Sequence, residues 1–304
     1  MEHLETLART LRERFPGLEL RENEPMSRHT TFRIGGPARL MALPWDRKEA
    51  AAVVRTAAEL GVRPFFLGNG SNLLVADSGY EGFVVKSSHL DQTREVNRRL
   101  RAESGIPLAR LAMAALGRGL SGLEFAHGIP GTLGGAVVMN AGAYGGEMAQ
   151  ILTAVTYLDE TGRVVTLPAS DCGLGYRHSL FSQHPDWLIV EAEMELQPGD
   201  GAAIKARMEE LGQKRRTKQP LEWPSAGSTF KRPEGHFAAA LIDQCGLKGL
   251  SVGGAQVSEK HAGFLINRGN ATAADMRRLM ELVGERVFRQ TGVELEPEVK
   301  FLGF

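Results

Sequence analysis

Residues 128–136 read Gly128-Ile129-Pro130-Gly131-Thr132-Leu133-Gly134-Gly135-Ala136, and residues 140–145 read Asn140-Ala141-Gly142-Ala143-Tyr144-Gly145. A glycine lacks the Cβ atom that would keep a ligand away from the main chain, and it also tolerates a positive φ angle. Glycines spaced this closely therefore predict a backbone that lies against a flat or a charged group. A tight turn or a crowded crossing in the core would give the same pattern, so this stretch alone leaves both interpretations open.

A second glycine loop follows a predicted strand at residues 64–67. It reads Gly68-Asn69-Gly70-Ser71-Asn72. Successive backbone N–H groups and a hydroxyl at the end of a strand suit a diphosphate, although a plain hairpin turn is the alternative. The loop differs from the dinucleotide fingerprint because no third glycine opens a helix. Together with residues 31–37 and 128–135, it favours a long nucleotide such as FAD.

Length and charge exclude several classes of protein. The chain has 304 residues, and Lys+Arg and Asp+Glu balance at 36 each, which argues against a nucleic-acid-binding protein. Its two cysteines form no CxxC pair, so neither a disulfide framework nor a metal site is predicted. No apolar run reaches the ~18 residues that a membrane span needs. We therefore expect a soluble cytoplasmic protein with a small-molecule partner and no membrane.

The spacing of apolar residues predicts the regular elements. Helices are expected over residues 1–15, 46–60, 107–118, 200–216 and 237–244 and from Thr272 onward. Strands are expected over residues 39–43, 64–67, 73–75, 82–85, 100–103, 153–158, 163–167, 187–196, 255–257 and 262–266, with a last one in the tail at 293–301. The opening is βαβ-like, and the middle of the chain is rich in β-structure.

Three residues could carry chemistry. Arg177 lies on a glycine-flanked segment, where it is either a solvated surface arginine or a fork for a carboxylate or an enolate. Ser228 lacks the Gly-x-Ser-x-Gly context of a hydrolytic nucleophile, so hydrolysis is disfavoured and proton donation stays open. Glu298 follows Glu294 and Glu296 at a spacing of two, and a solvated strand edge is the alternative reading for at least two of these glutamates.

Six segments in this order resemble the UDP-N-acetylenolpyruvoylglucosamine reductase family. They are residues 30–38, 67–74, 122–144, 175–179, 227–233 and 295–303. The resemblance implies an α+β fold of three domains, two of which form a vanillyl-alcohol-oxidase-like (PCMH-type) FAD-binding unit. Their expected bounds are 1–86, with the tail 292–304 packing on it, and 87–217; an α+β substrate-binding domain follows at 218–291.

The resemblance also implies the reaction. FAD is bound non-covalently, and NADPH passes a hydride to flavin N5. The hydride then moves to the methylene carbon of UDP-N-acetylglucosamine enolpyruvate, which gives UDP-N-acetylmuramate for peptidoglycan synthesis. Arg177 would stabilise the enolate, Glu298 would orient the carboxylate, and Ser228 would protonate the other carbon.

Further residues match positions at which the family contacts its ligands. The resemblance assigns FAD binding to Thr31, Gly68, Asn69, Gly70, Ser71, Asn72, Leu73, Gly128, Pro130, Gly131, Thr132, Gly134, Gly135, Asn140, Ala141 and Gly142, and substrate binding to Tyr144, Lys218 and Arg232. The short stretch from Arg177 to Ser228 resembles the compact variety of the family, which lacks a tyrosine-bearing insertion. The resemblance also implies a monomer, the usual state of the family. Two alternatives stay open: another FAD-dependent oxidase or dehydrogenase of the same fold, and a nucleotide-binding regulatory protein without catalysis.

Overall fold

The computed structural model describes residues 2–96 and 99–304. These residues form two compact units, each made of three stretches of chain. Unit 1 contains residues 1–22, 40–69 and 82–213, and unit 2 contains residues 23–39, 70–81 and 214–304. Among the described residues, no helix is long and apolar enough to cross a membrane. The division of the chain into three domains stays a prediction.

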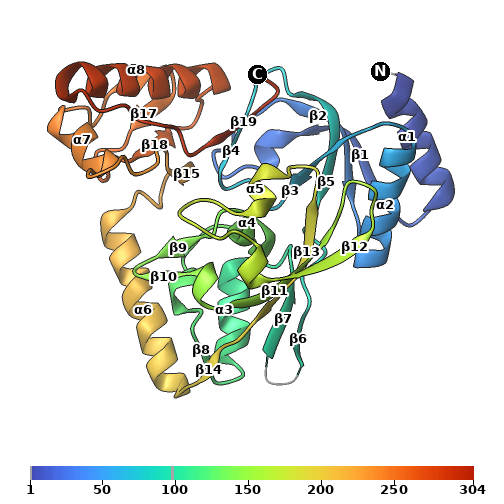
Figure 1. Cartoon of the computed structure of the whole chain (residues 1–304). Coiled ribbons are helices and arrows are strands. Elements are labelled where there is room, and N and C mark those ends of the chain that lie inside the picture. The colour runs from blue at the N-terminus through green and yellow to red at the C-terminus, as the bar shows by residue number, and fades with distance from the viewer. Residues whose placement is uncertain (1, 97–98) are drawn as a thin grey trace. The chain divides into compact units, whose positions relative to one another are not determined.

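The first sheet carries the N-terminal helices of unit 1. Its strand order is β1 (Glu19–Pro25), β2 (Pro37–Leu43), β5 (Tyr80–Lys86) and β3 (Pro64–Leu67), and β3 runs parallel to β5. Helices α1 (Glu2–Arg14) and α2 (Arg47–Glu59) lie side by side (Figure 1). Asp46 starts α2 by accepting a hydrogen bond from the amide of Glu49 at 2.8 Å, as expected of an N-cap aspartate. Strand β1 is the one element of this sheet that the sequence patterns did not predict.

A five-stranded antiparallel sheet forms the second part of unit 1. Its order is β12 (Val164–Pro168), β11 (Leu152–Leu158), β13 (Leu188–Met194), β7 (Arg99–Glu103) and β6 (Thr93–Val96). The predicted hairpin at residues 153–167 is therefore confirmed. The other elements here are α3 (Leu108–Leu116), β8 (Leu120–Ser121), α4 (Leu133–Val138), β9 (Gly142–Ala143), β10 (Gly146–Glu147), α5 (Leu180–Gln183) and β14 (Gln197–Pro198).

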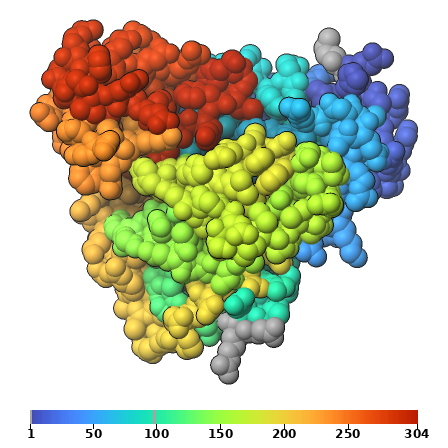
Figure 2. Space-filling model, in the orientation of Figure 1, coloured from blue at the N-terminus to red at the C-terminus, as the bar shows by residue number. Residues whose placement is uncertain are grey.

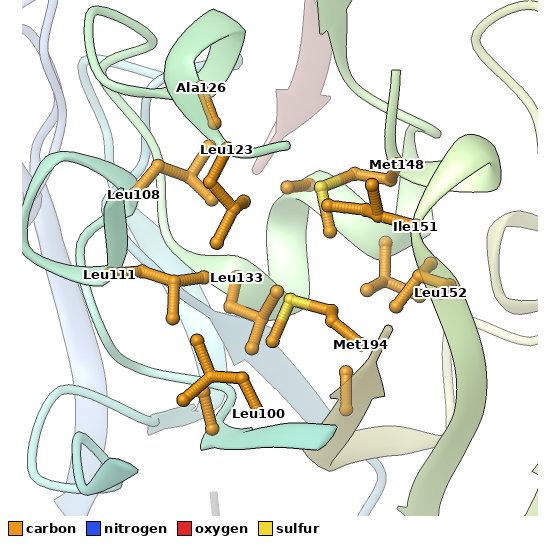
Figure 3. Packing of buried hydrophobic residues seen from close by; sticks show 14 of the residues in the cluster. Leu100, Leu108, Leu111, Leu123, Ala126, Leu133, Met148, Ile151, Leu152 and Met194 are labelled. Carbon is orange, nitrogen blue, oxygen red and sulfur yellow. The ribbon is translucent and has the colours of Figure 1, made fainter. Parts of the chain in front are cut away.

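An apolar core lies between this sheet and helices α3 and α4. Figure 3 shows side chains from both helices and from the strands pointing toward one another; the labelled ones include Leu100, Leu111, Leu123, Leu133, Ile151 and Met194. Each fully buried leucine contributes about 1.5–3 kcal/mol relative to an exposed one. Helix α4 starts inside the glycine-rich loop, so this core fixes the loop in place.

Helix α6 (Gly201–Lys218) differs from the other long helices because almost all of its surface is polar. Only Ile204, Met208 and Leu211 are buried. In the space-filling view the golden segment that contains α6 is exposed along the molecule's surface (Figure 2). The predicted helix at 200–216 is confirmed, and it carries the chain from unit 1 into unit 2.

Unit 2 is built around a sheet covered by a long helix. The strand order is β15 (Ser225–Ser228), β18 (Phe264–Asn267), β17 (Ala255–Val257) and β16 (Ser251–Val252). Helix α8 (Ala273–Thr291) packs on this sheet, and α7 (Ala238–Gln244) packs on α8. Thr272 and Asp275 form the predicted capping box at the start of α8, and Gly292 ends the helix in the left-handed conformation.

The C-terminal tail is a strand over only part of the predicted length. Strand β19 (Lys300–Leu302) pairs in parallel with β4 (Leu73–Val75), whereas residues 293–299 have no strand structure beyond an isolated bridge from Phe230 to Pro297. The prediction of a strand over 293–301 is therefore wrong for its first seven residues. Two of their backbone groups bond to residues 229–231: Glu296 O accepts from Lys231 N at 2.9 Å, and Glu298 N donates to Thr229 O at 2.8 Å.

Candidate functional site

In unit 1 the two glycine loops meet at Thr132. The side-chain oxygen of Thr132 lies 2.4 Å from the place that a Cβ atom would occupy on Gly68, so a larger residue there would require Thr132 to move. The backbone of Gly134 is held next to Ser104, because its amide donates to Ser104 O at 2.7 Å. Residues from the ends of β3 and β7 and from the start of α4 thus come together.

Two hydroxyls in this cluster are buried without a hydrogen-bond partner among the described residues. They are Ser104 Oγ and Thr132 Oγ1, on residues that are 1% and 6% exposed. A buried polar group that stays unsatisfied costs about 1–3 kcal/mol, so such groups usually mark a ligand or an ordered water. Ser104 was missed by the sequence reasoning, because a serine before a glycine carries no local signal of a binding site.

The turn that carries Arg177 is fastened to the end of α4. Asn140 Nδ2 donates to Gly175 O at 3.1 Å, and Ser179 Oγ donates to Val138 O at 2.7 Å. Arg177 itself has a φ angle of 53°, which is unusual for a residue with a side chain. The structure therefore places the predicted arginine next to the predicted cofactor loop, although they are 35 or more residues apart in sequence.

We expect Asn140→Asp to lower kcat by about ten-fold or more while FAD stays bound. The new carboxylate would still accept from Ala149 N, which lies 2.9 Å from Asn140 Oδ1, but it would face the Gly175 carbonyl with an acceptor in place of a donor. Steady-state kinetics and the FAD absorbance of the purified variant check this. Asn270→Asp, the same change at an exposed position of unit 2, is the control, and unchanged kcat in Asn140→Asp would contradict the positioning role.

The other ligand-binding residues predicted in unit 1 lie around the same loops. Thr132, Leu133 and Asn140 are buried and Gly134 is half-buried, while Asn69, Gly128, Pro130, Gly135 and Tyr144 are exposed. Gly131 accepts from Leu108 N at 2.9 Å, and Ala141 and Gly142 lead into the β9–β10 hairpin, whose turn carries Tyr144.

Unit 2 contains residues 70–72, the second part of the glycine loop at residues 68–72, which is called the phosphate-type loop below. Gly70 has a φ angle of 59°, and a Cβ atom on it would lie 2.1 Å from His29 O. Both the backbone conformation and the lack of space therefore favour glycine at this position. Its carbonyl accepts from Thr31 N at 3.3 Å. Thr31 Oγ1 is a third buried hydroxyl without a hydrogen-bond partner among the described residues. The predicted FAD contacts Thr31 and Gly70 are therefore neighbours.

Ser228 and Glu298 are brought together by backbone pairing. Glu298 N donates to Thr229 O at 2.8 Å, and Asn72 Nδ2 donates to Glu298 O at 3.0 Å. The side chain of Ser228 is exposed and that of Glu298 is half-buried, whereas Thr229 between them is buried. One serine, one carboxylate and the loop that contains Ser71, Asn72 and Leu73 thus share one region of unit 2.

The remaining predicted residues of unit 2 flank this region. Arg232 lies four residues beyond Ser228, with its guanidinium carbon 4.6 Å from the centre of the exposed Phe237 ring. Lys218 is exposed at the end of α6. Glu296 belongs elsewhere, because its carboxylate accepts from Lys231 Nζ at 2.5 Å on the exposed surface. Of the three alternating glutamates, only Glu298 is connected to Thr229 and Asn72.

Comparison with known proteins decides the family. A family model described as an FAD binding domain matches residues 38–168, and one described as the C-terminal domain of UDP-N-acetylenolpyruvoylglucosamine reductase matches residues 219–302. The UDP-N-acetylenolpyruvoylglucosamine reductase of Caldanaerobacter subterraneus subsp. tengcongensis is 48% identical over 281 residues, which cover 92% of this chain and 93% of the relative. The chain belongs to the UDP-N-acetylenolpyruvoylglucosamine reductase family.

Solved structures agree with this assignment. The crystal structure of the Thermus caldophilus reductase is 35% identical, has a TM-score of 0.79 and covers 94% of this chain and 98% of its own. Wild-type Phl p 4.0202, a glucose dehydrogenase, shares the fold alone, with 15% identity and a TM-score of 0.50 over 66% of this chain and 45% of its own. The predictions of an α+β fold with a vanillyl-alcohol-oxidase-like FAD-binding unit, of an oxidoreductase and of FAD as cofactor are therefore confirmed.

Proposed function

We propose that this chain reduces UDP-N-acetylglucosamine enolpyruvate to UDP-N-acetylmuramate, with NADPH as the reductant, in the synthesis of peptidoglycan precursors. The observation that supports the residue assignment is the backbone hydrogen bond from Glu298 N to Thr229 O, which joins Glu298 to the residue that follows Ser228 in a member of this reductase family. We also propose that the protein works in the cytoplasm as a monomer.

The residues present fit FAD. Three buried hydroxyls, on Thr31, Ser104 and Thr132, have no hydrogen-bond partner among the described residues, and all three lie beside glycine loops. We assign these hydroxyls to the cofactor, together with the backbone of residues 68–73, 128–135 and 140–142. FAD, when bound, supplies hydride transfer between NADPH and the enolpyruvyl group. The glycine loops let the backbone lie close to the cofactor, and the three hydroxyls give the cofactor hydrogen-bond partners in place of water.

Arg177 is assigned to the carboxylate of the enolpyruvyl group. A guanidinium is a planar fork that matches a carboxylate with two parallel hydrogen bonds, and it favours the negative charge that builds up on the enolate. The left-handed turn held by Asn140 and Ser179 fixes where this side chain starts. The backbone of Arg177 therefore does not depend on the substrate for its position.

Ser228 and Glu298 are assigned to the proton step. Hydride addition to the methylene carbon leaves the electron pair on the neighbouring carbon as an enolate. Ser228 Oγ donates its proton to that carbon, because an enolate carbon is basic enough to take a proton from an alcohol held beside it. Glu298 orients the carboxylate of the substrate. Tyr144, Lys218 and Arg232 are assigned to the rest of the sugar nucleotide.

A visible spectrum, followed by two anaerobic additions, tests the function. The purified protein is expected to be yellow, to lose its absorbance near 450 nm when NADPH is added, in line with flavin chemistry, and to recover it when UDP-N-acetylglucosamine enolpyruvate follows. Recovery with oxygen or a hydroxy acid but not with the enolpyruvyl substrate would indicate another oxidase or dehydrogenase of this fold. A colourless protein that stays colourless with added FAD would exclude the enzyme.

A further inference from the structure

His261 lies in unit 2 on the turn between β17 and β18, and its ring contacts Phe264 on β18, the strand that pairs with the one that holds Ser228. Its ring centre is 4.9 Å from that of Phe264, at 70° to it. Phe264 is the strand partner of Ser228, and directly opposed residues of an antiparallel pair share a face. The residues next to this pair are also bonded, because Thr229 N donates to Gly263 O at 2.9 Å. His261 is thus one aromatic ring away from the assigned proton donor.

The position of the imidazole ring is fixed by its neighbours. Gly263 N donates to His261 Nδ1 at 3.2 Å, and the ring lies against the Cα atom of Gly263, where a Cβ would come within 3.2 Å of it. Ser258 Oγ accepts from the amides of Lys260 and His261, which holds the turn itself. Since Nδ1 is an acceptor, a neutral ring must carry its proton on Nε2.

The charged groups near His261 are lysines that are partly paired with carboxylates, since Lys260 Nζ lies 3.7 Å from Glu222 Oε2. Burial lowers the pKa of His261, and the charges of Lys248 and Lys218 lower it further. The ring is therefore neutral near pH 7, and it keeps one donor, Nε2–H. Lys248 Nζ donates to Asp243 at 2.8 Å, which uses one of its three donors, and Lys260 Nζ donates to Arg216 O at 2.8 Å near the end of α6. The same two lysine charges that disfavour a protonated imidazole would stabilise an anion bound beside it.

We propose that His261 donates a hydrogen bond from Nε2 to the diphosphate of the sugar nucleotide, with Lys218 and Lys248 as the nearby positive charges. This inference rests on the proposed function and extends it to a residue that no sequence pattern singled out. A diphosphate fits better than a sugar hydroxyl because it needs both charge and donors. A neutral imidazole donor also adds a directed contact that a lysine, as a mobile point charge, does not give.

The test compares His261→Phe with His261→Gln. Phenylalanine keeps the ring against Phe264 and Gly263 but removes both the Nε2 donor and the Nδ1 acceptor of Gly263 N. Glutamine restores an N–H at the reach of Nε2 only, so the comparison of the two variants isolates the donor. UDP is the probe, measured as a competitive inhibitor, since it carries the diphosphate but neither the amino sugar nor the carboxylate. We expect His261→Phe to raise the Ki of UDP and the KM of the enolpyruvyl substrate by about ten-fold. His261→Gln should stay within about three-fold of the wild type.

The controls separate binding from folding and from the proposed function. His89→Phe replaces another aromatic-packed histidine, whose ring stacks on Trp45 at 3.8 Å, and should change neither constant. FAD content and thermal melting report whether each variant folds. A His261→Phe variant that binds UDP like the wild type overturns the inference, as does one in which only the KM changes, because the contact would then be with another part of the substrate. Wild-type protein that does not turn over would instead refute the proposed function.

Discussion

Ser228→Ala is expected to leave the reduction of bound FAD by NADPH unchanged and to slow its reoxidation by UDP-N-acetylglucosamine enolpyruvate by about 10²–10⁴-fold, the usual contribution of a positioned general acid. The change removes only a hydroxyl. Because Ser228 is exposed whereas its neighbour Thr229 is buried and accepts from Leu265 N at 3.2 Å, the alanine should not disturb the strand. The two half-reactions are measured separately by anaerobic stopped-flow absorbance.

The same strand supplies a matched control for this experiment. Ser225 lies three residues earlier on β15, pairs with Ile266 and has no assigned role, so Ser225→Ala should leave both half-reactions unchanged. Ser228→Cys should retain part of the reoxidation rate, because a thiol can also give up a proton. Equal loss of both half-reactions in Ser228→Ala would instead mean that the substitution damages the site, and the role of proton donor would be wrong.

Local signals in the sequence predicted most of the helices correctly. Asp46 before α2 and Thr272 with Asp275 before α8 act within one helical turn, so the residues that decide the helix start are adjacent in sequence. The tail shows the opposite case. Glu294 and Glu296 alternate as in a strand, but the backbone there pairs with residues 229–231, some 65 positions away, and no local pattern encodes such a partner.

The candidate site divides in the same way. The glycine loops and Arg177 were predictable because close backbone approach requires glycine and carboxylate recognition favours arginine. The hydrogen bond from Asn140 to Gly175, which fixes the arginine turn, was not predictable, since a buried asparagine cannot be told from an exposed one in the sequence. Ser104 and His261 gain their meaning only from burial and from neighbours on other strands.

Gly70→Ala tests whether the phosphate-type loop needs a residue without a side chain at position 70 in order to fold and to bind FAD. Two costs combine at this position. A residue with a side chain loses about 1–2 kcal/mol in the left-handed conformation, and the added Cβ would stand 2.1 Å from His29 O, which requires the main chain to move. Overpacking of this kind typically costs a further 1–3 kcal/mol, roughly. Movement of His29 also displaces Thr31, whose amide bonds Gly70 O and whose buried hydroxyl is assigned to FAD.

We therefore expect Gly70→Ala to lower the free energy of unfolding by about 2–5 kcal/mol and to release FAD during gel filtration. Gly61→Ala is the matched control, because Gly61 has a φ angle of 68° but nothing within 4 Å of its Cβ position. That variant should lose only the conformational cost of about 1–2 kcal/mol and keep its FAD. Urea unfolding and the ratio of flavin to protein absorbance measure both effects. If the two variants lose the same stability and both stay yellow, the close contact between Gly70 and His29 is not important for this loop. Glycine would then be needed at position 70 only for its positive φ angle.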